Sequence, residues 1–558
     1  DSMVVAPQRA SAAEALGGPQ GGAYRSPSIG INGVVSAAHG LAATAGLRIM
    51  MEGGNAVDAA VAVGAALGVV EPFMSGLGGG GGFMLFHDGK TGQAHGLDYV
   101  GLPPNAADPS AFSSIEAISR DVRSSTVPGT LGGWLTALER FGTMDRAAVF
   151  GPAIQLAQQG WPITAFASRQ LTECQQALGQ HASSRAEYLP AGRPARPGEI
   201  VPRANLARTY QEVVEGGAET FYKGALARRI CRANQQAGGW LTEADFAAFE
   251  ARWVQPLEIE YRGRTLRTLP PPSLGLQYLE SLKILEAYDL ADMGHNSAEY
   301  LHVVLEAIKL ASADRTRWSR GENPTIQAMI SPGYAAERRA LLDRQRAHPS
   351  EGERYLPNKS DEVAPGDPLR YARDHTTHFE VADGQGNIVA ITQSLGGAFG
   401  SGFVAGDTGL VLNNFLYWTD LDPASPNYMQ PNKRRESAMS PCIVSENGRP
   451  VLGIGTPGSF GILQTTLQML LNSIDFGMNV QAAIEAPRVR AFERTLVDAE
   501  ARIPTETLDG LRKLGHEINV LDNWTWKVGG GHGVAIDPDS DVLTGGADPR
   551  RDGASVAF

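Results

Sequence analysis

The chain has 558 residues, a formal net charge of −12, and hydrophobic and charged fractions of 42% and 19%. This composition is that of a globular protein that is long enough for a large core or several layers. The acidic balance argues against a nucleic-acid-binding protein, which would need a basic surface.

The cysteines and the apolar stretches argue against further classes of protein, namely disulfide-rich, CxxC metal-binding and membrane proteins. Cys174, Cys231 and Cys442 are far apart and odd in number, so we expect buried thiols and neither a disulfide framework nor a CxxC metal site. The longest apolar stretch, residues 56–70, is shorter than the ~20 residues that cross a bilayer, and it predicts a buried helix and no membrane partner. No signal peptide is visible, which favours a cytoplasmic protein. Because the chain begins with Asp, a periplasmic or secreted protein with a removed leader stays open.

The first hundred residues predict two helices and a β-hairpin. Residues 34–51 are rich in Ala and Leu and predict a helix, and residues 55–70 predict a second one. A glycine run at residues 78–82 leads into a predicted strand at 83–87, which should pair with residues 93–100 across a turn. The glycine run lacks the spacing of a phosphate-binding loop, so we interpret it as a tight turn.

The middle of the chain, residues 147–342, is predicted to be mostly helical, most clearly at residues 298–318, with strand at 257–269. Residues 348–374 are polar, charged and rich in Pro, which indicates an exposed, mobile linker. Beyond it, residues 377–381 and 388–394 predict paired strands, and shorter strands follow to the C-terminus.

Thr376 is the first candidate for chemistry, in the run Asp374-His-Thr-Thr-His378. A free α-amine, with a pKa of ~8, can take the proton of a Thr hydroxyl on the same residue. This chemistry needs a Thr at the start of a buried strand, released by cutting the preceding peptide bond, and Thr376 stands at such a junction. A simple strand start is the structural alternative. His375 and His378 could be metal ligands, but no third ligand is near, so no metal is predicted.

Two glycine-containing runs are weaker candidates. The run Gly455-Thr-Pro-Gly-Ser459 can aim adjacent backbone N–H groups at one point, as an oxyanion hole requires, although most such runs are simple turns. The run Gly545-Gly-Ala-Asp-Pro-Arg-Arg-Asp-Gly553 indicates a surface turn, or a segment whose arginines and aspartates hold the C-terminus by ion pairs.

Motifs along nearly the whole chain resemble those of the γ-glutamyltranspeptidase family, which includes cephalosporin acylases and oxamate amidohydrolases. So many matches in one order exclude chance, and they favour Thr376 as a nucleophile. The matching segments are Glu52-Gly-Gly-Asn-Ala-Val-Asp-Ala-Ala60, 78–84, Val127-Pro-Gly129, Gly238-Gly-Trp-Leu-Thr242, Pro270-Pro-Pro-Ser273, 306–314, Thr376-Thr-His378, Phe399-Gly-Ser401, Leu412-Asn-Asn414, Met439-Ser-Pro441, Gly455-Thr-Pro-Gly458 and Gly546-Ala-Asp-Pro-Arg550.

The resemblance implies an N-terminal-nucleophile (Ntn) hydrolase of the α+β class, with a four-layer αββα sandwich built as one composite domain. Its precursor would cut itself between His375 and Thr376. The products would be a large chain, residues 1–375 with a mobile linker at about 348–375, and a small chain, residues 376–558, which stay together as an αβ heterodimer. No cofactor or metal is implied.

The resemblance also assigns roles in the site. Thr376 would attack an acyl carbon, and water or an amine acceptor would take the acyl group. Ser394 stands where the family has a Thr that hydrogen-bonds the nucleophile. The backbone N–H groups of Gly458 and Ser459 match the oxyanion hole, and Ser459 replaces a Gly that a backbone donor does not require.

Four positions that bind the γ-glutamyl group in typical members differ here. Members carry an Arg for the α-carboxylate where this chain has Val100, and an Asp for the α-ammonium where it has Trp418. An Asn is replaced by Gly396, and the usual Ser-Ser pair is Ser437-Ala438. Because charge-assisted hydrogen bonds contribute ~1.5–3 kcal/mol each, losing the Arg and the Asp argues against a γ-glutamyl acyl group.

The acyl pocket is instead expected to be apolar and aromatic, and an uncharged, monoanionic or aromatic acyl group would fit it. Arg123, Arg434 and Arg435 are candidates to bind one carboxylate. The predicted substrate-binding residues are Val100, Gly396, Phe415, Tyr417, Trp418, Ser437 and Ala438.

The sequence therefore predicts an enzyme that cleaves an amide bond in a small molecule. A γ-glutamyltransferase or glutathione hydrolase with substitute contacts stays open. So does a hydrolase that cleaves a C–C bond in a biosynthetic pathway by attack of the same Thr on a ketone carbon. A binding protein that has lost catalysis is a fourth possibility, against which the intact Thr376, Ser394 and Gly458 argue.

Overall fold

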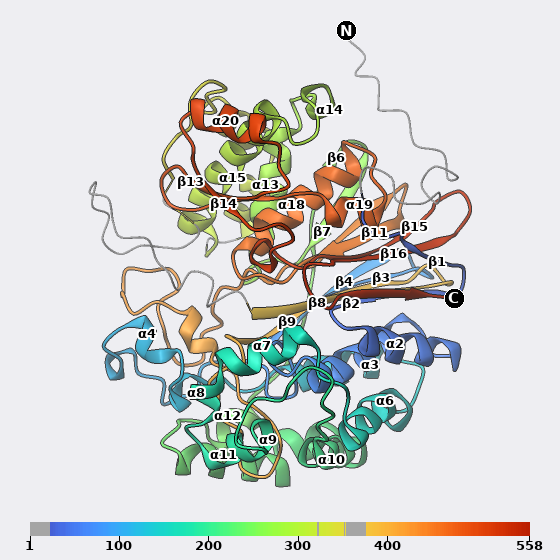
Figure 1. Ribbon diagram of the computed structural model, residues 1–558, viewed down its shortest axis with the longest axis vertical. Helices are drawn as coiled ribbons and strands as arrows, with labels where there is room; N and C mark the ends of the chain where they lie inside the picture. Colours follow the sequence, from blue (N-terminus) through green and yellow to red (C-terminus); the bar gives the residue numbers. More distant parts are fainter. Residues whose placement is uncertain (1–22, 321–322, 351, 353–374) are drawn as a thin grey trace.

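The computed structural model describes residues 23–320, 323–350, 352 and 375–558. These residues form two seven-stranded sheets that lie face to face, with helices over both outer faces (Figure 1). This confirms the predicted α+β class and four-layer αββα arrangement. A small three-stranded sheet lies beside the second layer of helices and contains β12 (Val489–Ala491), β13 (Leu496–Glu500) and β14 (Glu517–Leu521).

The first sheet is antiparallel and carries the two strands that were predicted on either side of residue 384. Strands β8 and β9 lie at its centre and are buried along their whole length, because helices cover one face and the second sheet covers the other. In sheet order the strands are β17 (Ala554–Ala557), β2 (Gly33–Ala37), β8 (His375–Asp383), β9 (Ile388–Gly396), β3 (Gly81–Asp88), β4 (Gln93–Asp98) and β5 (Arg252–Val254).

The second sheet is also antiparallel. In sheet order its strands are β1 (Ser28–Gly30), β16 (Leu543–Ala547), β15 (His532–Ile536), β11 (Arg449–Gly455), β10 (Cys442–Glu446), β7 (Arg264–Thr268) and β6 (Leu257–Tyr261). Both sheets thus combine strands that precede residue 376 with strands that follow it.

The helices form the two outer layers (Figure 1). On the side of the first sheet lie α2 (Gly40–Met51), α3 (Ala56–Val70), α4 (Ile115–Ile118), α5 (Thr130–Phe141), α6 (Arg146–Gln159), α7 (Ala165–Glu173), α8 (Gln175–Leu178), α9 (Ala182–Tyr188), α10 (Ala204–Tyr222), α11 (Ala225–Gln236) and α12 (Glu243–Ala247). On the side of the second sheet lie α13 (Leu276–Leu285), α14 (Leu290–Met293), α15 (Ala298–Trp318), α16 (Asn323–Met329), α17 (Pro332–Arg339), α18 (Gly461–Ile474), α19 (Val480–Glu485) and α20 (Thr505–Lys513).

Helix α3 is the predicted apolar helix, and every one of its residues is buried. A helix that is apolar on all sides belongs inside the protein, and α3 packs between the first sheet and α6. Asn55 caps its N-terminus by accepting from the N–H groups of Val57 and Asp58, and Asp58 accepts from the N–H of Asn55 in return.

The prediction of one helix over residues 34–51 is wrong in its first part. Residues 34–37 belong to strand β2, which pairs with β8 and β17, and α2 begins only after His39, whose side chain accepts from the N–H of Leu41. Small residues hide this change because Ala fits both elements. The predicted strand at 257–269 is a hairpin of β6 and β7, and most of the predicted linker at 348–374 lies outside the described residues.

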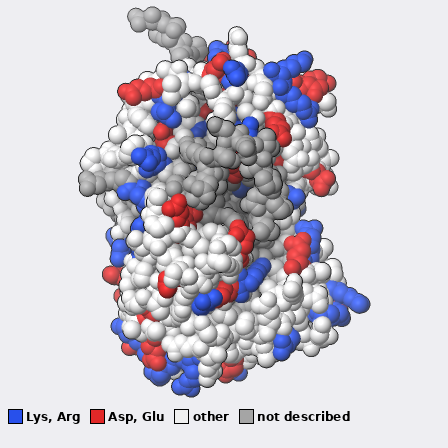
Figure 2. Space-filling view, turned by 90° about the vertical axis from the view of Figure 1, so that its left-hand side faces the viewer, with Lys and Arg blue, Asp and Glu red and all other residues white. Residues whose placement is uncertain are grey.

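Three further expectations concern the surface and the cysteines. The three cysteines are buried and unpaired. None of the described helices combines the length and the apolar character that crossing a membrane requires. Figure 2 shows one face of the molecule, on which acidic and basic side chains are intermixed and no large basic patch stands out.

Candidate active site around Thr376

Thr376 lies at the start of β8, in an irregular part of the pairing with β9. His375 pairs with Gly396 and Thr377 with Gln393, so the register shifts at Thr376. A bulge of this kind re-aims a side chain, and bulges are common beside active sites. The Oγ1 of Thr376 donates to the Oγ of Ser394 at 3.4 Å, and the Ser394 Oγ donates to the carbonyl oxygen of His375 at 2.7 Å. Both hydroxyl groups therefore lie at the peptide bond that precedes Thr376.

The turn at residues 455–459 joins β11 to α18 in an unusual backbone conformation. Gly458 has a φ of 133° and Ser459 a φ of 51°, in the left-handed region that non-glycine residues seldom adopt. Within the described part of the chain, the N–H groups of Gly458 and Ser459 donate to no other group. Such adjacent, unused N–H groups can bind an oxyanion.

A pocket of about 270 Å³ opens at Thr376. Residues from α18, the segment before β10, and the short helix η4 (Phe415–Trp418) contribute to it. The lining residues are Thr376, Trp418, Arg435, Glu436, Ser437, Ala438, Met439, Ser459, Phe460 and Ile462.

The gamma-glutamyltranspeptidase family model matches residues 42–558, which is nearly the whole chain. The chain belongs to the γ-glutamyltranspeptidase family. It is therefore an enzyme of the hydrolase and acylase type that this family contains, as the motifs predicted.

Several members resemble the chain over most of its length. A glutathione hydrolase proenzyme of Bacillus subtilis (strain 168) is 33% identical over 96% of this chain and 93% of that protein. The Acylase ACY 1 proenzyme of Pseudomonas sp. (strain SE83) is also 33% identical, over 96% of this chain and 95% of its own. The crystal structure of cephalosporin acylase from Bacillus halodurans matches with a TM-score of 0.86 and 31% identity, over 96% of this chain and 97% of that chain.

Only some of the predicted substrate-binding residues line the pocket. Trp418, Ser437 and Ala438 do so, together with the predicted catalytic residues Thr376 and Ser459. Four predicted contacts, Val100, Gly396, Phe415 and Tyr417, are buried but are not among the lining residues.

The neighbours of three of these residues, Gly396, Phe415 and Val100, explain their places. The N–H of Gly396 donates to the Oγ of Ser394 at 2.8 Å and so helps to orient that hydroxyl. Phe415 stacks on Trp418 and lies behind it. The carbonyl of Val100 accepts from Arg434, whose guanidinium also binds Asp98 at 2.8 Å.

Of the three candidate arginines, only Arg435 lines the pocket. Arg434 is bound to Asp98, and Arg123 is bound to Asp121 at 2.6 Å. The Cζ of Arg435 lies 3.8 Å from the ring centre of Phe415 and 4.5 Å from that of Trp418. The wall of the pocket is thus not only apolar, as the sequence suggested, but holds a buried cation. The sequence offers no signal that separates Arg435 from Arg434 beside it.

Sequence reasoning missed Glu436, which also lines the pocket. Its carboxylate accepts from the Oγ of Ser319 and lies 3.3 Å from Nε of Arg320. The partners come from the end of α15, more than a hundred residues earlier, so no local pattern points to this group.

A second set of contacts holds Thr376 from the side of the first sheet. Arg551 donates to the carbonyl of Thr376 at 3.4 Å, and the hydroxyl of Thr377 donates to Glu71 at 2.7 Å. Burial raises the pKa of Glu71 to about 7, although the Thr377 hydroxyl and Arg551 oppose that rise. Thr376 is therefore held through its own carbonyl and through its neighbour Thr377.

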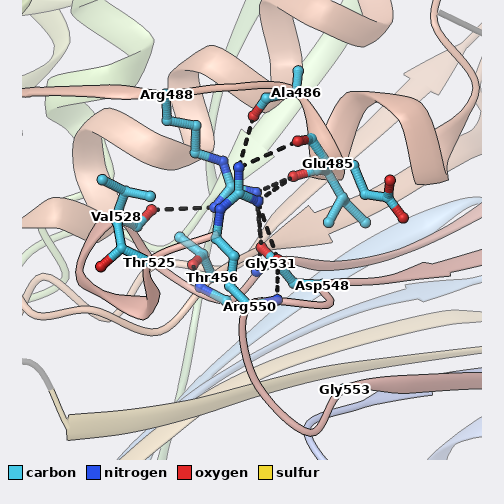
Figure 3. Close-up of polar contacts among 12 residues, drawn as sticks. Thr456, Glu485, Ala486, Arg488, Thr525, Val528, Gly531, Asp548, Arg550 and Gly553 are labelled. Carbon is cyan, nitrogen blue, oxygen red and sulfur yellow. Dashed lines mark hydrogen bonds and ion pairs between the residues drawn. The ribbon is translucent and has the colours of Figure 1, made fainter. Parts of the chain in front are cut away.

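The segment that carries Arg551 is fixed by buried ion pairs (Figure 3). Arg550 binds Glu500 at 2.7 Å and Asp548 at 3.1 Å, and Arg488 binds Asp548 at 2.9 Å, all four side chains being inaccessible to solvent. Burial alone would raise the pKa of Asp548, but Arg550 and Arg488 bring it well below its usual value. This confirms the interpretation that the C-terminal segment is held by ion pairs. We refer to these four residues as the buried ion network.

The buried ion network also reaches the turn at residues 455–459. Arg488 donates to the carbonyl of Val528 at 3.1 Å, and Asp548 accepts from the N–H of Gly531 at 2.9 Å (Figure 3). Between them, the N–H of Gly530 donates to the hydroxyl of Thr456 at 3.0 Å. The network thereby fixes the loop that lies against the turn at residues 455–459.

One cluster among the described residues has the composition of a metal site, namely His302, Glu306 and His516. Nδ1 of His302 lies 2.8 Å from Nε2 of His516, and Glu306 binds the ammonium of Lys309 at 2.7 Å. The lysine supplies the positive charge that a metal ion would bring. His375 and His378 have separate partners, Gln170 and the pair Thr392 and Glu380, so they do not converge on one ion.

Proposed function

We propose that the chain is an amide hydrolase that cuts itself before Thr376 and then uses the released Thr376 as its nucleophile. One observation carries the proposal: the hydroxyl groups of Thr376 and Ser394 lie together at the carbonyl of His375, and Thr376 also lines the pocket. The family supports it, because its relatives here are described as proenzymes.

In the proposed self-cleavage, Oγ of Thr376 attacks the carbonyl carbon of His375. The hydroxyl of Ser394 already donates to that carbonyl oxygen, so it would stabilise the negative charge that develops there. The C–N bond then breaks, and its nitrogen takes the proton that the Thr376 hydroxyl has lost and becomes the free α-amine of Thr376. Water hydrolyses the resulting ester, which leaves residues 1–375 and residues 376–558 as the two chains of a heterodimer.

In the proposed catalytic cycle, the α-amine of Thr376 takes the proton of its own hydroxyl, and Oγ attacks the substrate's acyl carbon. The N–H groups of Gly458 and Ser459 bind the oxyanion. The C–N bond of the amide breaks and the leaving amine takes the proton. Water, or an amine acceptor, then attacks the acyl-enzyme and restores the Thr376 hydroxyl.

The acyl group is proposed to differ from a standard γ-glutamyl group. The family's carboxylate-binding position is Val100, whose surroundings are occupied by Arg434 bound to Asp98, and the ammonium-binding position is the indole of Trp418. Hydrolysis of glutathione-type substrates through other contacts is the second candidate function, because the Bacillus subtilis relative is described as a glutathione hydrolase proenzyme.

The first test is the covalent state of the purified protein. Wild type should run as two chains on a denaturing gel, and Thr376→Ala as one chain of 59.2 kDa without hydrolase activity. Thr377→Ala is the matched control, because it removes the neighbouring hydroxyl that binds Glu71 and should still allow cleavage. Ser394→Ala should slow self-cleavage ~100-fold, in the range seen when an oxyanion donor is removed, and Ser394→Thr should restore most of it.

The second test compares acyl groups. Mass spectrometry of the products from γ-glutamyl and other acyl anilides identifies both the bond that is cut and the preferred acyl group. An active wild-type protein that remains one chain would refute the proposed mechanism, and stereospecific preference for the γ-glutamyl anilide would support the second candidate.

A further inference from the structure

Five of the ten residues that line the pocket come from one irregular segment, residues 418–438, which we call the wall segment. They are Trp418, Arg435, Glu436, Ser437 and Ala438. Between them, residues 419–434 form turns, bends and one isolated bridge, with no helix or longer strand. Because the wall segment has no ladder of hydrogen bonds of its own, its shape depends on contacts with other elements.

The two ends of the wall segment are held by neighbouring residues. Trp418 closes η4, and its ring stacks on that of Phe415. At the other end, the N–H of Ser437 donates to the carbonyl of Pro272, and the Ser437 carbonyl accepts from the N–H of Leu274. The stretch between the two ends needs a support of its own.

Arg320 supplies this support. Its Nη1 donates to the carbonyl of Arg434 at 2.8 Å, and its Nη2 donates to Oδ1 of Asn427 at 3.1 Å. Its Nε lies 3.3 Å from the carboxylate of Glu436. A guanidinium presents its donors in one rigid plane, so three points of the wall segment are fixed relative to one another.

Asn427 extends these contacts to the pocket lining. Its Oδ1 also accepts from the N–H of Glu436 at 2.9 Å, and its Nδ2 donates to the carbonyl of Trp418 at 2.7 Å. The side chain is buried, so water does not compete strongly for these hydrogen bonds. Two residues that line the pocket, Trp418 and Glu436, are thus joined through one amide that Arg320 orients.

The element behind Arg320 is rigid. Arg320 follows α15, most of whose residues are buried, and α15 packs along α13 in the outer helix layer (Figure 1). Ser319 adds a hydrogen bond to the carboxylate of Glu436. Arg320 is not among the lining residues, so it can act on the pocket only through the wall segment.

We propose that Arg320 is a positioning residue for the substrate pocket: by binding Asn427, Glu436 and the Arg434 carbonyl together, it fixes the wall segment in the conformation that lines the pocket with Thr376. This inference rests on the proposed function, because it assigns a role in substrate binding. Thr376 and Ser394 are held by separate contacts. Loss of Arg320 should therefore weaken substrate binding and spare the chemical step.

Hydrogen exchange tests this support without any substrate. In Arg320→Met, the N–H of Glu436 should exchange roughly 10-fold faster or more, as expected when about one net hydrogen bond to a charged group is lost. Mass spectrometry of peptides from residues 418–438 measures the rate. Peptides from β8 and β9 should exchange as they do in wild type.

Kinetics test the consequence for binding, with the p-nitroanilides of γ-glutamyl, glutaryl and butyryl groups as probes. For the probes that wild type hydrolyses, Arg320→Met should raise KM roughly 10-fold, because a smaller fraction of the molecules has the binding conformation. The value of kcat should stay within about 2-fold, since the bound complex restores that conformation. Arg320→Lys keeps the charge but not the planar set of donors, so it should raise KM less.

A stranded charge is the alternative cause of such an effect, because Arg320→Met also leaves the carboxylate of Glu436 without this cation. The double variant Arg320→Met/Glu436→Gln removes both charges. It should keep the raised KM and the faster exchange, since Asn427 and the Arg434 carbonyl still lose the guanidinium. Wild-type values of both quantities in the double variant would overturn the inference.

Arg338→Met is the matched control. Arg338 of α17 binds Asp314 of α15 at 2.6 Å, and the side-chain exposures of this pair, 20% and 8%, match the 25% and 8% of Arg320 and Glu436. Its loss should change neither KM nor the exchange of the wall segment. Equal changes in Arg320→Met and Arg338→Met, or no change in Arg320→Met, would contradict the role of Arg320. If Arg320→Met does not fold, exchange and KM in Arg320→Lys decide in the same way.

The two measurements separate this inference from the proposed function. A two-chain, Thr376-dependent hydrolase whose KM and exchange do not respond to Arg320→Met contradicts only the role of Arg320. An unbroken chain contradicts the proposed function itself, and the exchange of the wall segment then still tests the support by Arg320.

Discussion

Glu71 ends α3 beside strand β8, where its carboxylate accepts a hydrogen bond from the hydroxyl of Thr377. It is 3% exposed, and burial raises its pKa from 4.5 to about 7, with Arg551 and Asp552 acting in opposite directions. Its carboxyl group is therefore neutral in mildly acidic solution and becomes charged near neutral pH. The stability of the protein should respond to this change.

The sign follows from the direction of the pKa shift. Between pH 4.5 and about 7 the folded state keeps a proton that the unfolded state loses, so stability from this group is full below pH 4.5 and is lost as the pH rises through about 7. Over the whole titration of Glu71, the free energy of unfolding changes by about 3 kcal/mol. Glu71→Gln cannot ionise, so its thermal midpoint should rise relative to wild type as the pH increases from 5 to 8.

Thermal unfolding of both proteins across this pH range measures the effect. Glu52→Gln is the control, because Glu52 ends α2 in the same way but is exposed, and it should leave the pH dependence unchanged. A constant difference between Glu71→Gln and wild type at every pH would show that Glu71 does not ionise as described.

At the scale of elements, the glycine run at the start of β3 lets three segments approach closely. They are β3 itself, strand β9 and the segment at Tyr99. Gly81 has a φ of 108°, and a Cβ there would overlap the carbonyl oxygen of Tyr99. The same residue pairs with Ser394 across β3 and β9. The tight turn predicted from the glycine run is thus confirmed, and it lies beside the hydroxyl that faces Thr376.

Gly81→Ala is therefore expected to destabilise the protein more than Gly53→Ala. Gly53 has a φ of 100°, but a Cβ there would meet nothing within 4 Å, so it reports the cost of the backbone conformation alone, about 1–2 kcal/mol. The overlap at Gly81 should add about 1–3 kcal/mol. Thermal midpoints measure the difference, and equal losses in the two variants would show that crowding at Tyr99 does not matter.

Local sequence patterns predicted most of these elements. They failed where the conformation of a segment depends on residues far away in the sequence. Helices α3 and α15 and the turns of the hairpins depend on neighbouring residues, so they could be predicted. Strand β2 could not, because residues 34–37 are small and β-branched side chains whose strand conformation depends on β8, more than three hundred residues later. The pocket shows the same limit, since Arg435 becomes a pocket residue only through Phe415 and Trp418.

At the scale of the whole molecule, the buried ion network joins several segments of the C-terminal part of the chain, between residues 488 and 550. It connects β13, the end of α19, the loop at residues 526–531 and the C-terminal segment. Charges without access to water are stable only when each one keeps its partners. Replacing any one of its four charged side chains should therefore destabilise the folded protein.

Asp548→Asn leaves Arg488 and Arg550 facing each other without their shared carboxylate. We expect a loss of about 3–5 kcal/mol in the free energy of unfolding, measured by urea denaturation. Asp541→Asn is the matched control, because Asp541 pairs with Arg449 on the surface, where ion pairs contribute little. A similar loss in both variants, or none in Asp548→Asn, would contradict the importance of the network.

The order of strands in the two sheets has a consequence for the proposed heterodimer. Strands β8 and β9 lie between β2 and β3, and in the second sheet β10 and β11 separate β7 from β15. After a cut before Thr376, neither fragment could depart by simple dilution, since both sheets would have to open along several seams at once. Reassembly from separated fragments would then be a bimolecular event, and its speed would depend on concentration, whereas the intact precursor needs no encounter at all.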